Sequence, residues 1–211
     1  TAHYNVLRNE NVVALCDVND LRTKEAVAAF PKAKTYWDWR KMMDQKDIEA
    51  VVICTADHQH AFIANWAINR GMHVYCEKPM AGTYHDAADM FEAAREHSRM
   101  LHIQMGTLYG AEARAARRLI EDGHLGKIYY ARSFGYRRRG RPFVDGYGSA
   151  AFVDKGISAG GALYDMGIYH IAQILHLLGN PAVKTVTGAS HQELEMDAAR
   201  RSFSGYSVEE M

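Results

Sequence analysis

Cysteine, net charge and long apolar runs are all scarce in this chain. Its 211 residues contain three cysteines, and 25 lysines and arginines balance 25 aspartates and glutamates. No apolar run approaches the roughly 20 residues that a membrane-spanning helix needs, and no signal peptide is visible. The balanced charge gives no indication of a nucleic-acid partner. We therefore expect a cytoplasmic globular protein with neither membrane nor nucleic acid as its partner.

The three cysteines are placed too far apart for a metal-binding motif. Cys16, Cys54 and Cys76 each end an apolar, strand-like run, and none forms a Cys-x-x-Cys pair. An odd number of thiols at buried strand ends is typical of reduced cysteines. The sequence therefore predicts neither a disulfide framework nor a metal site.

Apolar runs alternate with helical patterns along the first half of the chain. Strands are expected at 12–18, 50–55 and 72–76, and a helical stretch follows each of them. The continuous apolar run at 12–18 is typical of a strand that is covered on both faces. This alternation is typical of an α/β fold with a doubly wound parallel sheet. A further strand is expected at 101–109.

The second half has a different composition and two expected elements of note. From about residue 105 glycine and aromatic residues become frequent, which indicates a second domain. The aromatic and β-branched segment 127–137 is expected to form an exposed strand. A Gly pair then opens an apolar helix over 160–179, which carries an acid, a phenol and an imidazole.

Four segments together carry a family resemblance. They are CDVND (16–20), VVICTADHQHAFIANWAINRG (51–71), the Glu-Lys-Pro tripeptide within HVYCEKPMAG (73–82), and the helix GGALYDMGIYHIAQILHLLG (160–179). In this order and spacing the chain resembles the Gfo/Idh/MocA family of NAD(P)-dependent sugar and polyol oxidoreductases.

The resemblance implies two domains. Residues 1–105 would form a Rossmann-like dinucleotide-binding domain that lacks its first strand and glycine-rich loop, since no G-x-G-x-x-G occurs in the sequence. Residues 106–211 would form an α+β substrate-binding domain, with part of a large, open, mostly antiparallel sheet that joins a homodimer or homotetramer. Without the loop, whose N–H groups bind pyrophosphate, we expect this chain alone to bind NAD poorly.

The cofactor residues implied by the resemblance lie at strand ends. Asp17 would accept hydrogen bonds from the adenosine ribose and repel a 2′-phosphate, which favours NAD over NADP; alternatively, it is a plain helix N-cap. Thr55 would line the cofactor, although Ala56 replaces the family's usual proline. His60 would lie near the cofactor, or it is a structural histidine packed under its helix.

Glu77, Lys78 and Pro79 supply the strongest catalytic signal. A lysine at a strand end beside the nicotinamide would stabilise the oxyanion that develops during hydride transfer. Glu77 would set the position of Lys78 and its basicity. In the family the bond before Pro79 is often cis.

The glycine-opened helix would complete the catalytic group. Family members usually have Asp-x-x-x-His, but here Tyr169 follows Asp165 at the fourth position and His170 comes next. Tyr169 would be the proton donor or acceptor, Asp165 would position the substrate or Lys78, and His170 is a second candidate for the proton or a core histidine.

Substrate contacts are expected from residues around the domain boundary. Gln104 and Tyr109 would read substrate hydroxyls. The arginine-rich stretch 137–141 would recognise a phosphate or carboxylate or, with Tyr147, form a mobile cover; alternatively, it is a solvated loop or strand end. The leading hypothesis is an NAD-dependent dehydrogenase acting on a secondary alcohol of a sugar, sugar derivative or polyol. The alternatives are an NAD-dependent glycosidase without net redox change and a non-catalytic regulator that senses nucleotide or sugar.

Overall fold

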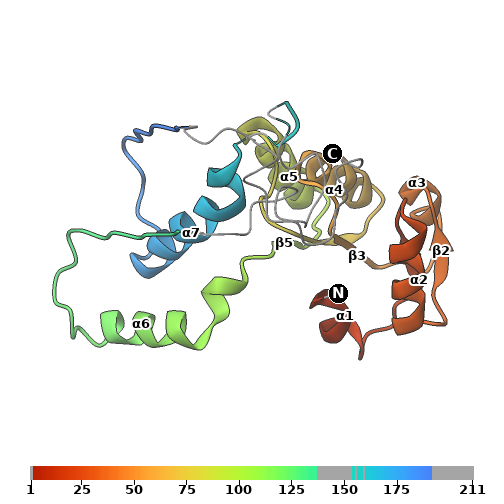
Figure 1. The fold of residues 1–211 in the computed structure, drawn as a ribbon, viewed down its shortest axis with the longest axis horizontal. Helices are drawn as coiled ribbons and strands as arrows, with labels where there is room; N and C mark the ends of the chain where they lie inside the picture. The colour runs from red at the N-terminus through yellow and green to blue at the C-terminus, as the bar shows by residue number, and fades with distance from the viewer. Residues whose placement is uncertain (1, 137–153, 155, 159, 192–211) are drawn as a thin grey trace, which may run out of the picture.

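The computed structural model describes residues 2–136, 154, 156–158 and 160–191 (Figure 1). The first half of the chain contains α1 (Ala2–Leu7), β1 (Ala14–Cys16), α2 (Asp20–Ala29), β2 (Lys34–Tyr36), α3 (Trp39–Met42), β3 (Ala50–Ile53), the 3-10 helix η1 (Asp57–Gln59), α4 (His60–Asn69), β4 (His73–Cys76), α5 (Tyr84–Glu96) and β5 (Leu101–Ile103). The second half contains the 3-10 helix η2 (Gly106–Tyr109), α6 (Ala111–Glu121), the π-helical turn η4 (Leu163–Gly167) and α7 (Ile168–Leu177).

The strands pair in parallel, which confirms the α/β class expected from the sequence. They form two sheets in the described residues, β1-β2 and β3-β4-β5. The short strand β2 was not anticipated, because its three residues lie between two helices without an apolar run. The strand expected at 12–18 is also shorter than predicted, since β1 spans three residues. All three of these residues are only half-buried.

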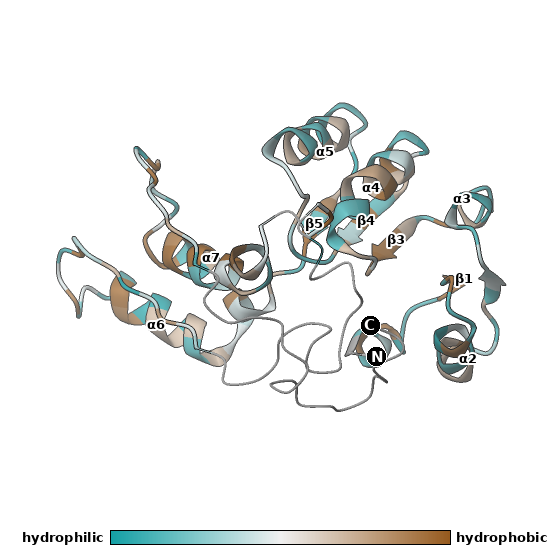
Figure 2. Ribbon diagram, turned by 45° about the horizontal axis from the view of Figure 1, so that its top comes forward, coloured by the Kyte–Doolittle hydropathy of each residue, from teal (hydrophilic) through white to brown (hydrophobic). Residues whose placement is uncertain are grey.

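The apolar core lies on one face of the β3-β4-β5 sheet, where α4 and α5 cover it (Figure 2). Val51 and Ile53 point into this core, whereas Val52, between them, is 41% exposed. In the described part of the chain, the face of β3 that carries Val52 is thus less covered than the face that carries Val51 and Ile53. The side chains of the core are Met43, Val51, Ile53, Ile63, Ala64, Ala67, Ile68, Met72, Val74, Cys76, Ala81, Met90 and Ala94.

Local sequence signals explain where the helices begin and end. The Asn19 side chain accepts hydrogen bonds from the N–H groups of Leu21 and Arg22 and so caps α2. Thr83 caps α5 in the same way. Gly71 follows α4 with a φ of +81°, a conformation that glycine adopts without the penalty of a Cβ.

Two expected strands differ from the structure. The strand predicted at 101–109 ends at Ile103, because its partner β4 ends at Cys76; the last ladder bond runs from the Gln104 N–H to the Cys76 carbonyl. The described part of 127–137 is mostly exposed and forms no strand. An extended segment needs a neighbouring strand to pair with, and the described residues supply none for it.

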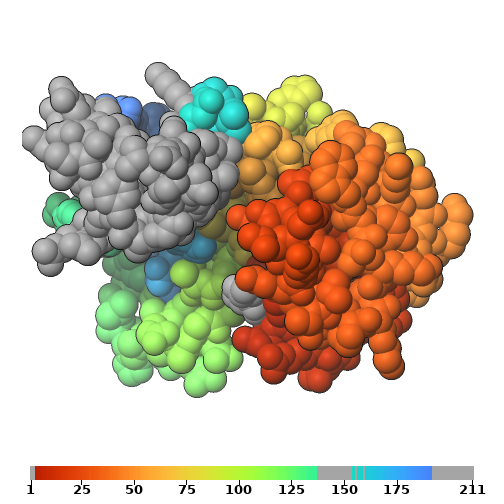
Figure 3. Space-filling view, turned by 45° about the vertical axis from the view of Figure 1, so that its right-hand side comes forward, coloured from red at the N-terminus to blue at the C-terminus, as the bar shows by residue number. Residues whose placement is uncertain are grey.

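The helices of the second half lie together at one end of the molecule, opposite α2, β2 and α3 (Figure 1). The Arg117 guanidinium of α6 donates a hydrogen bond of 2.7 Å to the His176 carbonyl near the end of α7. In the space-filling view α6 and the N-terminal segment appear on opposite sides of the same face (Figure 3). None of the helices in the described ranges has the length and apolar content needed to cross a bilayer.

Candidate active site

The candidate site is centred on the turn that follows β4. Cys76, the last residue of the strand, is fully buried, and burial raises the pKa of its thiol to about 12, so it stays protonated and unreactive. Glu77 and Lys78 follow at the carboxyl end of the sheet, where ligands bind in parallel α/β folds. The Lys78–Pro79 peptide bond is cis, as the family resemblance implied.

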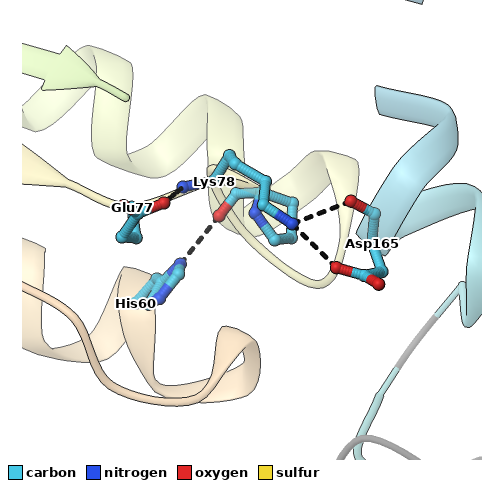
Figure 4. A network of polar contacts seen from close by, with 5 residues as sticks. His60, Glu77, Lys78 and Asp165 are labelled. Carbon is cyan, nitrogen blue, oxygen red and sulfur yellow. Dashed lines mark hydrogen bonds and ion pairs between the residues drawn. The ribbon is translucent and has the colours of Figure 1, made fainter. Parts of the chain in front are cut away.

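The Lys78 ammonium reaches a residue 87 positions further along the chain. Its Nζ donates to the Asp165 Oδ1 at 2.9 Å and to the Asp165 carbonyl at 2.8 Å (Figure 4). The two side chains are 13% and 22% exposed, so the pair is largely shielded from water. An ammonium has three N–H donors. Two are used on Asp165, and the third remains for an oxygen of a bound molecule.

Tyr169 contacts the same ammonium with its ring. The Lys78 Nζ lies 5.0 Å from the centroid of the Tyr169 ring, within the range of a cation–π interaction. The π-helical turn η4 carries Asp165 and continues directly into α7, which carries Tyr169. Lys78 is thus held from one side by a carboxylate, a carbonyl and an aromatic face, all from the second half of the chain.

Glu77 contacts the backbone of Lys78 rather than its ammonium. Its Oε2 accepts a hydrogen bond of 3.1 Å from the Lys78 N–H, and its Oε1 lies 2.8 Å from the His3 Nε2. The expectation that Glu77 would tune the basicity of Lys78 directly therefore has no support in these contacts. Glu77 instead fixes the peptide from which the lysine extends.

His60 supports the turn from below. It is fully buried, and its Nδ1 lies 2.7 Å from the Pro79 carbonyl (Figure 4). Its Nε2 lies 3.2 Å from the Thr55 carbonyl. A neutral imidazole carries one N–H and so donates only one of these bonds. Of the two interpretations made from the sequence, this geometry favours the structural histidine, because a fully buried ring has no surface for a cofactor.

Asp57 belongs to the site although the sequence argument did not select it. Burial raises the pKa of its carboxyl, and the charge of Asp165 acts in the same direction, whereas His60 and Lys78 lower it. The residue therefore lies within electrostatic reach of the Lys78–Asp165 pair. Its position in the sequence could have indicated this, because Asp57 follows β3 and the carboxyl ends of neighbouring parallel strands meet at one edge of a sheet.

The other expected residues make no contact with the Lys78 ammonium in the described structure. Asp17 follows β1, and its Oδ1 accepts a hydrogen bond of 2.8 Å from the Asn19 N–H; since Asn19 caps α2, Asp17 is not the N-cap. Thr55 is exposed after β3. Gln104 follows β5, and the exposed Tyr109 has its ring centroid 6.2 Å from that of His102.

His170 is directed to a different neighbour. Its Nδ1 is hydrogen-bonded to the Ser133 hydroxyl, and a Cβ at Gly135 would clash with its Nε2. The segment that contains Ser133 and Gly135 therefore covers the imidazole. No periodic pattern in the sequence predicts this contact, because it joins residues 37 positions apart. Residues 137–141 and Tyr147 lie outside the described residues.

Residues at the carboxyl ends of strands in both parallel sheets fit a dinucleotide cofactor in their positions and chemistry. Asp17, Thr55 and Lys78 follow β1, β3 and β4 and so stand at the carboxyl ends of parallel strands. A carboxylate suits a ribose diol, and a shielded ammonium suits an oxygen that gains negative charge. Among the described residues no group of three or more His, Cys, Asp or Glu side chains is arranged to hold a metal ion.

Comparison with known proteins gives matches along most of the chain. The model of an oxidoreductase family with an NAD-binding Rossmann fold (GFO_IDH_MocA) matches residues 1–105, and that of the GFO/IDH/MocA C-terminal domain matches residues 113–203. The D-glucoside 3-dehydrogenase of Escherichia coli (strain K12) is 29% identical over 194 residues, which cover 92% of this chain and 54% of that protein.

Two further relatives are named as dehydrogenases of inositol, a polyol. The inositol 2-dehydrogenase of Salmonella typhimurium is 31% identical over 125 residues, which cover 58% of this chain and 37% of that protein. The crystal structure of myo-inositol 2-dehydrogenase from Lactobacillus plantarum superposes with a TM-score of 0.69 at 24% identity, over 84% of this chain and 52% of that one, which shows the shared fold. The chain thus spans about half the length, or less, of the relatives it matches.

Proposed function

Because this chain belongs to the GFO/IDH/MocA family of NAD-binding oxidoreductases, we propose that the protein transfers a hydride between NAD and a secondary alcohol of a sugar, sugar derivative or polyol. The observation that carries the proposal is the Lys78 ammonium, which stands at the end of β4 and is held by Asp165 and Tyr169. A pure binding module has no need of such a shielded, oriented cation.

Lys78, Asp165 and Tyr169 would each have a separate role in the reaction. The remaining N–H of Lys78 donates to the oxygen of the reacting carbon and stabilises the charge that develops there. Asp165 holds Lys78 in place and balances its charge. Tyr169, which contacts Lys78, would relay the hydroxyl proton, accepting it on its phenolic oxygen as its own proton leaves to water; it ranks ahead of His170, which is covered by Ser133. Bound NAD supplies the hydride acceptor.

We assign the cofactor to the carboxyl ends of the strands in residues 1–105. Asp17 would accept from the adenosine ribose, and Thr55 and the Glu77–Lys78 turn would line the nicotinamide half. A carboxylate at Asp17 repels a 2′-phosphate, so Asp17→Ser should raise the use of NADP relative to NAD. An unchanged ratio of kcat/KM for the two cofactors would remove this assignment.

Residues 106–211 would form the substrate domain. Tyr109 in this domain and Gln104, just before it, would read substrate hydroxyls. The exposed Tyr129, Tyr130 and Phe134 support a role for this half in a homodimer or homotetramer. Sedimentation of the intact protein tests the assembly, since a mass equal to one chain would contradict it.

The decisive experiment follows NADH absorbance while the intact protein is offered NAD with a panel of sugars, polyols and uronates. Lys78→Ala should lower kcat about a hundred- to a thousand-fold and leave NAD affinity nearly unchanged. Lys24→Ala, on the exposed face of α2, is the matched control and should behave like wild type. Full activity of Lys78→Ala would contradict the proposal, and sugar release without NADH would favour the redox-neutral glycosidase.

A further inference from the structure

The Glu77 carboxylate links two parts of the chain that are 74 residues apart. One oxygen, Oε1, lies 2.8 Å from the Nε2 of His3 on α1, and the other, Oε2, accepts from the Lys78 N–H. His3 and Glu77 are about one quarter exposed, with side-chain values of 24% and 26%. Glu77 therefore has two defined partners, and one of them is the peptide of the candidate catalytic lysine.

The chemistry of the two groups fixes how this contact is made. An ionised carboxylate only accepts hydrogen bonds, so the His3 Nε2 must carry the proton that lies between them. The bond is charge-assisted, because the acceptor is an anion. The His3 ring is held in turn by Tyr75, whose ring it meets edge-on with centroids 6.3 Å apart.

The Glu77–Pro79 turn is thus held at both of its ends by histidines. His3 holds Glu77 on one side, and the buried His60 holds the Pro79 carbonyl on the other. Lys78 lies between them with its ammonium on Asp165. Without the donor at His3, a partly exposed Glu77 carboxylate is free to turn to water and leave the Lys78 N–H.

We propose that His3 is a positioning residue for Lys78, acting through the Glu77 carboxylate. The inference rests on the proposed function, because it assigns the effect of His3 to the lysine that stabilises the reacting oxygen. Helix α1 thereby contributes to the geometry of the catalytic turn although no residue of it contacts Lys78 in the described structure. His3 is not assigned any contact with the substrate.

The test uses two replacements of His3 in the intact protein. His3→Leu removes the donor, whereas His3→Gln keeps an N–H of similar reach. We expect His3→Leu to lower kcat about ten- to a hundred-fold, the cost of a small misplacement of a catalytic group, with KM values close to wild type. His3→Gln should recover most of that loss. Equal losses in both variants, or a change confined to KM, would overturn the proposal.

A double-mutant cycle tests the route through Glu77. Two residues that act through one contact give non-additive losses. In a Glu77→Ala background, His3→Leu should therefore change kcat by less than about two-fold. Multiplicative losses would show that His3 acts independently of Glu77.

Two controls separate this inference from the proposed function. His102→Leu removes a ring that stacks on Tyr75 with centroids 4.9 Å apart and has no contact with Glu77, so kcat should stay near wild type. An equal loss in His102→Leu would assign the effect to packing around Tyr75. If Lys78→Ala abolishes turnover while His3→Leu is unaffected, only the role of His3 fails; if Lys78→Ala is fully active, the proposed function itself fails.

Discussion

The two halves of the described chain treat their apolar residues differently. The segment from Met43 to Ile103 buries its apolar side chains in one cluster under α4 and α5. Beyond residue 105, Ala113 is the one buried side chain among the described residues, although α7 is as apolar as α4 (Figure 2). The first half thus carries its own core, and the second contributes functional groups from helices that are only half-buried.

This difference indicates how the site gains its rigidity. Lys78 extends from a turn anchored on the core through Cys76, Pro79 and His60. Asp165 and Tyr169 come from the half with little core of its own. The Lys78–Asp165 contact therefore joins a turn anchored on the core to a helical segment that is only half-buried.

Truncation of a matched isoleucine in each half should show the largest difference in packing between α4 and α7. Ile68 is fully buried in α4, whereas Ile171 in α7 is 45% exposed. Ile68→Ala should lower the free energy of unfolding by about 2–5 kcal/mol, through lost burial and a cavity. Ile171→Ala should lower it by less than about 1 kcal/mol. Denaturant titration measures both, and equal losses would mean that α7 is as firmly packed as α4.

A smaller effect is expected at the junction. Asp165→Ala removes the carboxylate from a shielded ammonium and should destabilise the protein by about 1.5–3 kcal/mol, as for hydrogen bonds to charged groups. Glu92→Ala is the matched control, since Glu92 pairs with Arg95 on the exposed surface of α5. Such pairs contribute less than about 1 kcal/mol. If both variants lose the same stability, the Lys78–Asp165 pair behaves as an ordinary surface pair.

Local signals in the sequence were sufficient for several elements of the first half, although not for the short strand β2. Caps at Asn19 and Thr83 and a stop at Gly71 depend on neighbouring residues only, so they are legible without the fold. The parallel α/β arrangement follows from their alternation. Lys78 and Asp165 were both selected as candidates, because a lysine at a strand end and an acid on an apolar helix are unusual in themselves.

The remaining contacts depend on the geometry of distant side chains. The His3–Glu77 bond and the His170–Ser133 bond join residues 74 and 37 positions apart. Neither follows from periodicity, because any of the chain's 11 histidines offers the same donor. The strand expected at 127–137 is absent from the described residues for a related reason. Its composition suits a strand, but strand formation depends on a partner that composition does not supply.

The weakest effect expected here concerns Asp57 and the pH dependence of stability. Burial raises the pKa of Asp57 above its ordinary value. Such a carboxyl stabilises the fold at pH below its unfolded pKa, and this contribution is lost as the pH rises through the folded pKa. At neutral pH the ionised Asp57 therefore disfavours the folded state. Asp57→Asn should raise Tm at pH 7, and the advantage should shrink as the pH falls toward 4.

Asp38 provides the matched variant of opposite sign. The hydrogen bond from the Arg40 N–H lowers the pKa of Asp38, so its contribution is present above the unfolded pKa and is lost as the pH falls through the folded pKa. Asp38→Asn should therefore lower Tm slightly at pH 7. Thermal melts of both variants from pH 4 to 7 decide the matter. If Asp57→Asn instead loses stability at neutral pH, the attraction of Lys78 outweighs burial, and Asp57 belongs with Asp165 as a stabilising partner of the junction between the two halves.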